Sequence, residues 1–364
     1  MNPLKNLSVL RKLTQLASFV FLVYGSIWVG FYGADKLSHA FPALTCAYDA
    51  QTADYCVLVP IQHQMAHRVG TAISTGNDVL KALLPTALSL GTFLLLFVFL
   101  NKAFCGWICP LGFFQEITHL LGQKLGLKQV ETLKDGSVDR LRPWKWITLG
   151  VLVFGLPVLA GAGVVAHDLG NPFCDICPSR LLTTLASGDT SQLFIDPTTP
   201  AKLILSMTGT FLFGLMIALG LTLRQPFCRV CPMLGLHAVF RKLGFARLIK
   251  NGSARCDKCG LCAKACPMDI REIHTDMTRR DVTFPDCTLC GRCVEFCPDS
   301  DVLQLRYLGL PLFRSSPAYF KTRKKAQGEW EAIRFIPSPA AQAAKRPPAQ
   351  EQTGGQTQAK GVEE

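Results

Sequence analysis

Two stretches near the C-terminus decide the fold of that part of the chain: CDKCGLCAKACP at residues 256–267 and CTLCGRCVEFCP at residues 287–298. Both follow the pattern Cys-x2-Cys-x2-Cys-x3-Cys-Pro. Three cysteines in a tight loop can hold three corners of a [4Fe–4S] cube. The fourth, followed by a proline that turns the chain away, reaches a different cube. The spacing therefore predicts two [4Fe–4S] clusters that share the two motifs.

The crossed arrangement divides these eight cysteines into two sets. We predict one cluster on Cys256, Cys259, Cys262 and Cys297, and the other on Cys287, Cys290, Cys293 and Cys266. Gly260 and Gly291 lie between the second and third cysteine of each run, where a small residue lets backbone N–H groups point at cluster sulfide. Zinc is the alternative, but zinc sites favour two separated Cys-x2-Cys knuckles over four cysteines in eleven residues.

This stretch, 255–306, resembles the bacterial two-cluster ferredoxin module. The resemblance implies a small α+β domain that carries electrons, and we expect it to occupy residues 251–310 in the cytoplasm. The segment that follows, 311–364, becomes rich in Pro, Ala, Gln and Gly and is expected to be an extended or disordered tail.

Upstream of the motifs, the 364-residue chain is apolar: 49% of its residues are hydrophobic and its mean hydropathy is +0.26. Four stretches, 13–34, 82–101, 146–166 and 203–223, contain no Asp, Glu, Lys or Arg. Each is about the 20 residues that a helix needs to cross a bilayer. Buried core helices are the alternative, and a signal peptide is the alternative for the first stretch. The pattern favours an all-α membrane domain of four transmembrane helices at residues 1–250.

Charge along the connecting segments predicts the orientation. Lys and Arg predominate in the N-terminal tail, in the middle loop and after the fourth span, whereas acids predominate in the first and third loops. Both termini should therefore face the cytoplasm at the inner membrane. Residues 233–250 predict a basic amphipathic helix on the membrane surface, with a solvated helix of the soluble domain as the alternative. The net charge of +12 is thus explained without nucleic acid.

The other eight cysteines come in four pairs that follow this topology. Each half of the membrane domain reads span, outer pair, span, inner pair, which predicts two repeats related by an axis along the membrane normal. The inner pairs are Cys105 with Cys109 and Cys228 with Cys231; the outer pairs are Cys46 with Cys56 and Cys174 with Cys177.

Each group of pairs carries its own hypothesis. We predict that the inner pairs share an iron–sulfur cluster, with structural or regulatory thiols as the alternative. For the outer pairs two interpretations stay open, a fourth cluster or a redox-active disulfide, because the periplasm is oxidising. His119 and His237 follow the inner pairs and are candidates for a quinone site, although ordinary helix histidines are commoner. His63 and His67, at i and i+4, are similarly weak candidates for haem or metal.

Over residues 13–306 the chain resembles the NapH-, MauN- and NosR-type membrane polyferredoxins, which resemble the membrane component of a [4Fe–4S] quinol dehydrogenase. The resemblance rests on spans followed by Cys-x3-Cys-Pro-type motifs and a two-cluster ferredoxin tail. It implies transfer of electrons between the quinone pool or a cytoplasmic donor and a periplasmic acceptor, with other redox proteins as partners. The second inner motif departs from the pattern, since it is Cys-x2-Cys-Pro, and the flavin-binding domain of NosR-type proteins is absent.

The sequence thus predicts an electron-transfer component rather than a stand-alone enzyme, with no catalytic residues of its own. The alternative is an assembly or maintenance factor that reduces a metal or a disulfide for a periplasmic metalloenzyme. A transporter is disfavoured because the spans contain no charged residue. The chain also contains no P-loop and no G-x-G-x-x-G fingerprint.

Overall fold

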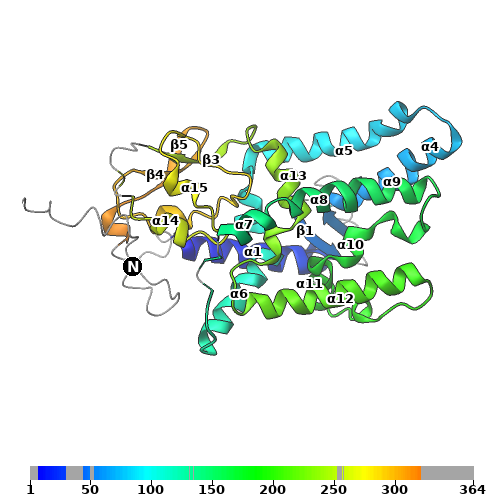
Figure 1. The fold of residues 1–364 in the computed structure, drawn as a ribbon, viewed down its shortest axis with the longest axis horizontal. Helices are drawn as coiled ribbons and strands as arrows, with labels where there is room; N and C mark the ends of the chain where they lie inside the picture. Colours follow the sequence, from blue (N-terminus) through cyan, green and yellow to red (C-terminus); the bar gives the residue numbers. More distant parts are fainter. Residues whose placement is uncertain are drawn as a thin grey trace, which may run out of the picture.

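The computed structural model describes residues 7–29, 44–49, 53–130, 132–133, 135–251, 256 and 258–320, with the backbone alone for 25–29, 44–49, 53–55 and 135. Long helices extend to one end of the molecule, and a small sheet with short helices lies at the opposite end (Figure 1). We call these two parts the membrane part and the ferredoxin part, after the sequence motifs they carry.

The membrane part contains four helical segments long and apolar enough to cross a bilayer, as predicted from the four uncharged stretches. They are α1 (Leu7–Val29), α5 (Val79–Leu100), the run Gly136–Gly161 and α12 (Pro200–Gly220). The third run is assembled from α7 (Asp135–Leu141), α8 (Trp144–Ile147), the π-helical η4 (Thr148–Gly155) and α9 (Leu156–Gly161). Large apolar side chains such as Leu88 and Phe211 are exposed on these helices, as expected for surfaces that contact lipid.

Several short elements fold back between the spans. The first group is β1 (Leu44–Asp49), β2 (Ala53–Cys56), α3 (Leu58–Gln64), η2 (Met65–Gly70) and α4 (Thr71–Thr75); the second is η5 (His167–Gly170), α10 (Pro172–Ile176), α11 (Pro178–Ala186) and η6 (Ser191–Leu193). Figure 1 shows α10 and α11 beside the middle of the long helices. A Cβ on Gly209, halfway along α12, would lie only 2.8 Å from the Asp175 carbonyl oxygen, so α10 packs against the centre of that span.

The C-terminal ends of α5 and α12 lead into η3 (Phe104–Ile108) with α6 (Pro110–Lys124) and into η7 (Phe227–Arg229) with α13 (Pro232–Phe240), respectively. The ferredoxin part then forms an antiparallel sheet in the order β3 (Ala246–Lys250), β4 (Leu303–Tyr307) and β5 (Leu310–Arg314). Strand β3 pairs with β4 from Ala246 opposite Tyr307 to Lys250 opposite Leu303. Short helices α14 (Leu261–Lys264), α15 (Glu272–Thr275) and α16 (Arg292–Glu295) complete it.

The prediction of a surface-lying amphipathic helix at 233–250 was wrong. Helix α13 ends at Phe240, and its residues 232–238 are all buried. Residues Ala246–Lys250 instead form β3, whose alternating burial fits a strand with one face on the ferredoxin core. The domain boundary predicted after residue 250 therefore falls between a strand and the rest of its own sheet.

The boundary predicted after residue 310 also differs from the structure. It divides β5, which pairs with β4 from Tyr307 opposite Leu310 to Gln304 opposite Arg314. Beyond the strand, the Tyr319 hydroxyl donates to Glu295 Oε1 at 3.0 Å, so the chain is held against α16 at least this far. Residues 321–364, most of the predicted tail, lie outside the described residues.

The membrane and ferredoxin parts are joined by buried polar contacts. At the start of α1, the backbone N–H of Ser8 donates to Glu295 Oε1 at 2.6 Å, and Ser8 Oγ contacts the other carboxylate oxygen. Arg11, fully buried, pairs with Glu116 of α6 at 2.9 Å and reaches the Cys290 carbonyl oxygen at 3.5 Å. Because a buried charge is stable only with partners, these contacts fix α1 against the cluster-binding loop.

The membrane packing predicts that Gly161→Ala is destabilising. A Cβ there would overlap the Ala66 carbonyl oxygen and lie 3.0 Å from Ala66 Cα, so α9 and η2 would have to separate. We expect a loss of about 1–3 kcal/mol in the free energy of unfolding, as in other overpacked sites. Thermal unfolding in detergent micelles measures it. Gly150→Ala is the matched control on the same span, because nothing lies within 4 Å of its Cβ; equal midpoints for the two variants would contradict this packing.

Candidate functional site

The two cysteine motifs of the ferredoxin part fold into loops of the same backbone conformation. Lys258 and Leu289, each just before the second cysteine of its motif, have φ of 50° and 52°. Gly260 and Gly291, each just after it, have φ of 74° and 77° and begin α14 and α16. This left-handed region is easily reached by glycine, which explains the residue type at both positions.

The first predicted set of ferredoxin cysteines gathers around a common centre. Burial raises the pKa of Cys262, and the neighbouring thiols of Cys297, Cys259 and Cys256 raise it further. The second set behaves in the same way, because burial and the thiols of Cys290, Cys287 and Cys266 raise the pKa of Cys293. Cys262 also contributes to the shift at Cys293, so the two sets are neighbours.

These sets fit the needs of iron–sulfur clusters. Buried thiolates repel one another, and bound iron relieves that repulsion because a metal ion reverses the local charge balance. Backbone N–H groups already point at the sulfurs: that of Leu289 donates to Cys287 Sγ at 3.4 Å, and those of Met268 and Ile270 lower the pKa of Cys266. In the part of the chain that is described, no three His, Cys, Asp or Glu side chains converge on a single metal-ion position. A cube needs a wider arrangement, since each cysteine binds a different iron.

The four inner cysteines also converge, from four separate elements. Cys105 lies in η3 and Cys228 in η7, while Cys109 and Cys231 are the N-cap residues of α6 and α13. Burial raises the pKa of Cys105, and the thiols of Cys109, Cys231 and Cys228 add to the shift. The positive ends of α6 and α13 favour thiolates at the two caps. The arrangement can therefore hold four anionic sulfur ligands.

Two polar side chains contact the sulfurs of this inner set. Gln115 of α6 donates from Nε2 to Cys228 Sγ at 3.4 Å, while its Oε1 accepts from the Phe227 backbone N–H at 3.0 Å. His237 of α13 places Nδ1 3.3 Å from Cys105 Sγ. Burial, with a smaller contribution from Lys102, lowers the pKa of His237 to about 3, so the ring is neutral. A neutral ring can donate one hydrogen bond to the sulfur.

The inner set touches the second ferredoxin set through the backbone. A Cβ on Gly106, next to Cys105, would overlap the Thr288 carbonyl oxygen and lie 3.1 Å from Cys290 Cα. Trp107 Nε1 donates to the Leu289 carbonyl oxygen at 3.0 Å. The loop that carries Cys105 is thus packed against the loop that carries Cys287 and Cys290, with no side chain between them at Gly106.

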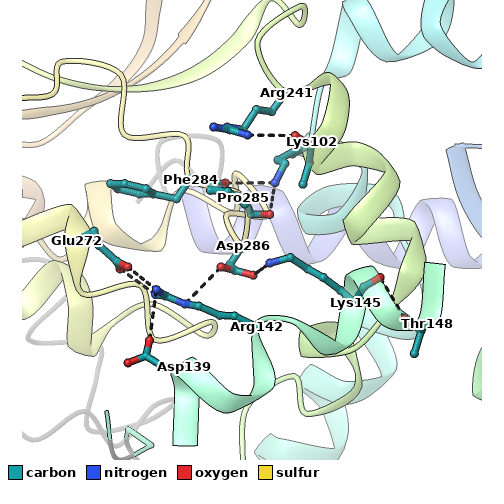
Figure 2. A network of polar contacts seen from close by, with 11 residues as sticks. Lys102, Asp139, Arg142, Lys145, Thr148, Arg241, Glu272, Phe284, Pro285 and Asp286 are labelled. Carbon is teal, nitrogen blue, oxygen red and sulfur yellow. Dashed lines mark hydrogen bonds and ion pairs between the residues drawn. The ribbon is translucent and has the colours of Figure 1, made fainter. Parts of the chain in front are cut away.

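A network of charges surrounds this junction (Figure 2). Lys145 of α8, in the N-terminal half of the run Gly136–Gly161, pairs with Asp286, the residue before Cys287. Arg142 approaches the same carboxylate at 3.5 Å and binds Glu272 through two contacts of 2.5 and 2.9 Å. These pairs hold the ferredoxin part against the end of the third span.

Lys102 is a buried cation that interacts with cysteines of both the inner set and the second ferredoxin set. It is fully buried, and its Nζ donates to the carbonyl oxygens of Phe284, at 3.2 Å, and Pro285. Burial lowers the pKa of Lys102 to about 8, while the thiols of Cys287 and Cys105 act to raise it. One positive charge therefore lies between the inner set and the second ferredoxin set.

The outer pairs lie elsewhere than expected. Cys174 is in α10 and Cys177 caps α11, both beside the middle of α12 and buried, whereas the sequence analysis expected them at the outer face. Cys56, at the end of β2, is also buried and raises the pKa of Cys174 and Cys177. Cys46 lies on β1, which pairs with β2; its side chain is outside the described set.

A glutamine on α3 repeats the role of Gln115. Gln62 donates from Nε2 to Cys174 Sγ at 3.0 Å, and its Oε1 accepts from the Phe173 backbone N–H at 3.1 Å. Sequence reasoning missed both glutamines, although a signal exists. Residues 56–62 (CVLVPIQ) and 109–115 (CPLGFFQ) share Cys-x-Leu-x3-Gln, and residues 172–178 (PFCDICP) and 226–232 (PFCRVCP) are nearly identical.

Three histidines lie together, whereas His119 lies beside the inner set. His63, His67 and His167 are neighbours and exposed, with ring centroids 4.4 and 5.4 Å apart along the series. His119 of α6 lies in a small, partly open pocket that Gln115, Arg224 and Arg292 also line. Its Nε2 accepts from Arg224 Nε at 3.2 Å. This pocket borders the inner set through Gln115.

Comparison with protein families identifies two matching regions. Residues 83–128 match a 4Fe-4S binding domain, and residues 248–298 match a 4Fe-4S dicluster domain. The first match includes Cys105 and Cys109. The second begins eight residues before Cys256, so it also includes residues 248–250 of β3.

Individual relatives extend over more of the chain. The proposed electron transport protein YccM of Escherichia coli is 26% identical over 307 residues, 83% of this chain and 76% of the relative. The ferredoxin-type protein NapH of Haemophilus influenzae is 26% identical over 235 residues, 62% of this chain and 71% of the relative. The methylamine utilization ferredoxin-type protein MauN of Methylobacillus flagellatus is 28% identical over 172 residues, 47% of this chain and 50% of the relative. No solved structure matches the chain significantly.

The matching domains and the apolar helices define an iron–sulfur electron-transfer protein with membrane-type helices. Within that class the chain is similar to ferredoxin-type proteins of the NapH and MauN type, which confirms the resemblance drawn from its motifs.

The position of Lys102 predicts an electrostatic effect on the two neighbouring cluster sites. Lys102→Met removes a positive charge that stabilises the more negative, reduced state of a cluster. A charge interaction of about 1–2 kcal/mol, at an effective dielectric constant of about 20, corresponds to midpoint potentials lower by roughly 40–90 mV. An EPR-monitored redox titration measures the change. Lys242→Met is the control, because Lys242 is exposed; an unchanged set of potentials in Lys102→Met would contradict the prediction.

Proposed function

We propose that the protein relays electrons between its ferredoxin part and an inner iron–sulfur cluster at the membrane, in contact with a cytoplasmic donor or the quinone pool on one side and a periplasmic acceptor on the other. The ferredoxin part would hold two [4Fe–4S] clusters on the two cysteine sets given above. Cys105, Cys109, Cys228 and Cys231 would hold a third cluster. A [4Fe–4S] cluster supplies reversible one-electron storage.

The observation that carries this proposal is the contact of Gly106 with the Cys290 loop. Electron transfer needs cofactors that are close together, and the backbones that carry two of the proposed sites touch here. The burial of Cys105, Cys287 and Cys293 supports the same function, because it excludes water and so reduces the reorganisation that accompanies each transfer.

The chain's own residues would then set the potentials. Backbone N–H groups and Gln115 donate hydrogen bonds to cysteine sulfur, and such bonds favour the reduced cluster. His237 Nδ1 would add another if the proton is on that nitrogen. Lys102 adds a positive charge between two sites. The ion pairs of Arg142 and Lys145 hold the ferredoxin part in register with the membrane part.

We also propose the orientation that the Lys and Arg asymmetry predicts, with both termini and the ferredoxin part in the cytoplasm. The two halves of the membrane part would be repeats, each with an outer and an inner cysteine pair. The pocket at His119 and Arg224 is the best-supported place for a quinone headgroup, because it combines polar donors with proximity to Cys228 through Gln115.

An assembly or maintenance factor, which reduces a metal or disulfide for a periplasmic metalloenzyme, is the second candidate. Such a factor would use the same electron relay and would differ only in the molecule that accepts the electrons. Reduction of the purified protein by a quinol analogue would favour a respiratory role, whereas reduction only by a cytoplasmic ferredoxin would favour the factor.

The inner site predicts a shared loss of iron. Cys109→Ser and Cys231→Ser should each remove about four of the irons bound by the anaerobically purified protein, and the double variant should remove no more, because one cluster is lost as a unit. Iron and acid-labile sulfide per chain give the count. The control is the EPR spectrum of the ferredoxin part, which should persist. Additive losses, or none, would contradict a shared cluster.

The contact at Gly106 also predicts an effect on the coupling between clusters, with no change in the iron bound per chain. Gly106→Val would push the Cys105 loop away from Thr288 and Cys290, so magnetic coupling between the reduced clusters should weaken while iron per chain stays the same. Pulsed EPR of the fully reduced protein measures the coupling. Gly214→Val is the control, because nothing lies within 4 Å of a Cβ at Gly214. Unchanged coupling in Gly106→Val would show that electrons do not depend on this contact.

A further inference from the structure

We propose that Cys46, Cys56, Cys174 and Cys177 bind a fourth [4Fe–4S] cluster inside the membrane part, next to the inner cluster, instead of forming a redox-active disulfide at the outer surface. This inference rests on the proposed function, because it extends the same relay by one site. Its evidence is the geometry around three of these cysteines, together with the strand that carries the fourth.

The first argument is the repeated glutamine. Gln62 and Gln115 each lie six residues after a cysteine, Cys56 and Cys109. In each case the side-chain Nε2 donates to the backbone carbonyl of a leucine one turn earlier and to the sulfur of a cysteine in a distant element. The side-chain Oε1 accepts from the backbone N–H of the phenylalanine just before that cysteine. All three contacts recur, at 3.0, 3.0 and 3.1 Å around Gln62 and at 3.2, 3.4 and 3.0 Å around Gln115.

The second argument is the repeated helix cap. Cys177 precedes Pro178 at the start of α11, as Cys231 precedes Pro232 at the start of α13. The two cysteines have nearly the same backbone conformation, φ −74° and ψ 119° against φ −67° and ψ 124°. Both helices are nine residues long, and each directs its positive end at a cysteine that belongs to a thiol cluster. Cys56, Cys174 and Cys177 therefore correspond to Cys109, Cys228 and Cys231.

The third argument is depth. Cys56, Cys174 and Cys177 are each at most 9% exposed, and α10 packs on Gly209 at the midpoint of α12. A site there is distant from the oxidising enzymes that maintain periplasmic disulfides. None of the fifteen cysteines whose side chains are described is in a disulfide. The thiol of Cys174 has those of Cys56 and Cys177 as neighbours, which is the grouping of buried sulfurs that a cluster needs.

The position of the site gives it a role in the relay. Cys177 and Cys231 belong to the same buried cluster of side chains, so the proposed fourth site lies next to the inner set. Arg180, paired with Asp175 at 2.5 Å, lies in the helix that Cys177 caps and would offset the negative charge of a reduced cluster. One electron leaving the inner cluster would oxidise it and reduce the fourth, with no other reactant required.

The test compares Cys177→Ala with its counterpart at the inner set, Cys231→Ala, in protein purified without oxygen. Wild type should contain about 16 irons per chain, each single variant about 12 and the double variant about 8. Loss of iron in Cys231→Ala but not in Cys177→Ala would overturn this inference and leave the proposed function standing. If neither variant loses iron, both this inference and the proposed function are rejected.

A second pair of variants tests the site without removing a ligand. Gln62→Met should shift the EPR signal or midpoint of one cluster, and Gln115→Met those of a different one, with iron content unchanged. If both variants alter the same cluster, or if mass spectrometry of unreduced wild type finds Cys174 linked to Cys177, the fourth cluster is rejected. Wild-type iron near 12 per chain would reject it as well, even if the cysteine variants fail to fold.

Discussion

The constraint on which the rest of the structure depends is the gathering of thiols in places from which water is excluded. Buried thiolates repel one another and lose hydration, and the pKa values of Cys105, Cys174 and Cys293 are raised for these reasons. Hydrogen-bond donors close to the sulfurs offset part of this cost in free energy. Helix N-termini begin at cysteines, backbone N–H groups point at sulfur, and Gln62 and Gln115 bind sulfur from another element. Bound iron would complete the compensation.

Close approach of the sites is secured by a different set of contacts. Gly106 lets the Cys105 loop rest on the Cys290 backbone, and the absence of a side chain there is a requirement of the packing. Around it, Lys145 and Arg142 pair with Asp286 and Glu272, and Arg229 of η7 binds Asp269 at 2.8 Å. Such buried pairs are weak evidence for stability but define one orientation, because displacement would leave a charge unpaired. The ferredoxin part is thereby held where its second cysteine set faces the inner set.

How much the sequence predicts depends on how local the signal is. The ferredoxin spacing and the uncharged stretches are local, and the matching domains and apolar helices bear them out. The strand Ala246–Lys250 was missed because its basic, partly apolar sequence also fits a surface helix, and its pairing partner is more than fifty residues away. The mid-depth position of Cys174 and Cys177 depends on packing against Gly209, which no periodicity reveals. The glutamine partners of the cysteines could have been found by aligning 56–62 with 109–115.

The central claim is that electrons cross from the ferredoxin part into the membrane through adjacent cysteine sets. The most direct measurement uses proteoliposomes that enclose ferricyanide, with the ferredoxin part facing outward and dithionite, which does not permeate the membrane, added outside. The account predicts that internal ferricyanide is reduced, and that Gly106→Val slows this reduction while Gly214→Val does not. Complete reduction of the clusters with no reduction of internal ferricyanide would contradict it.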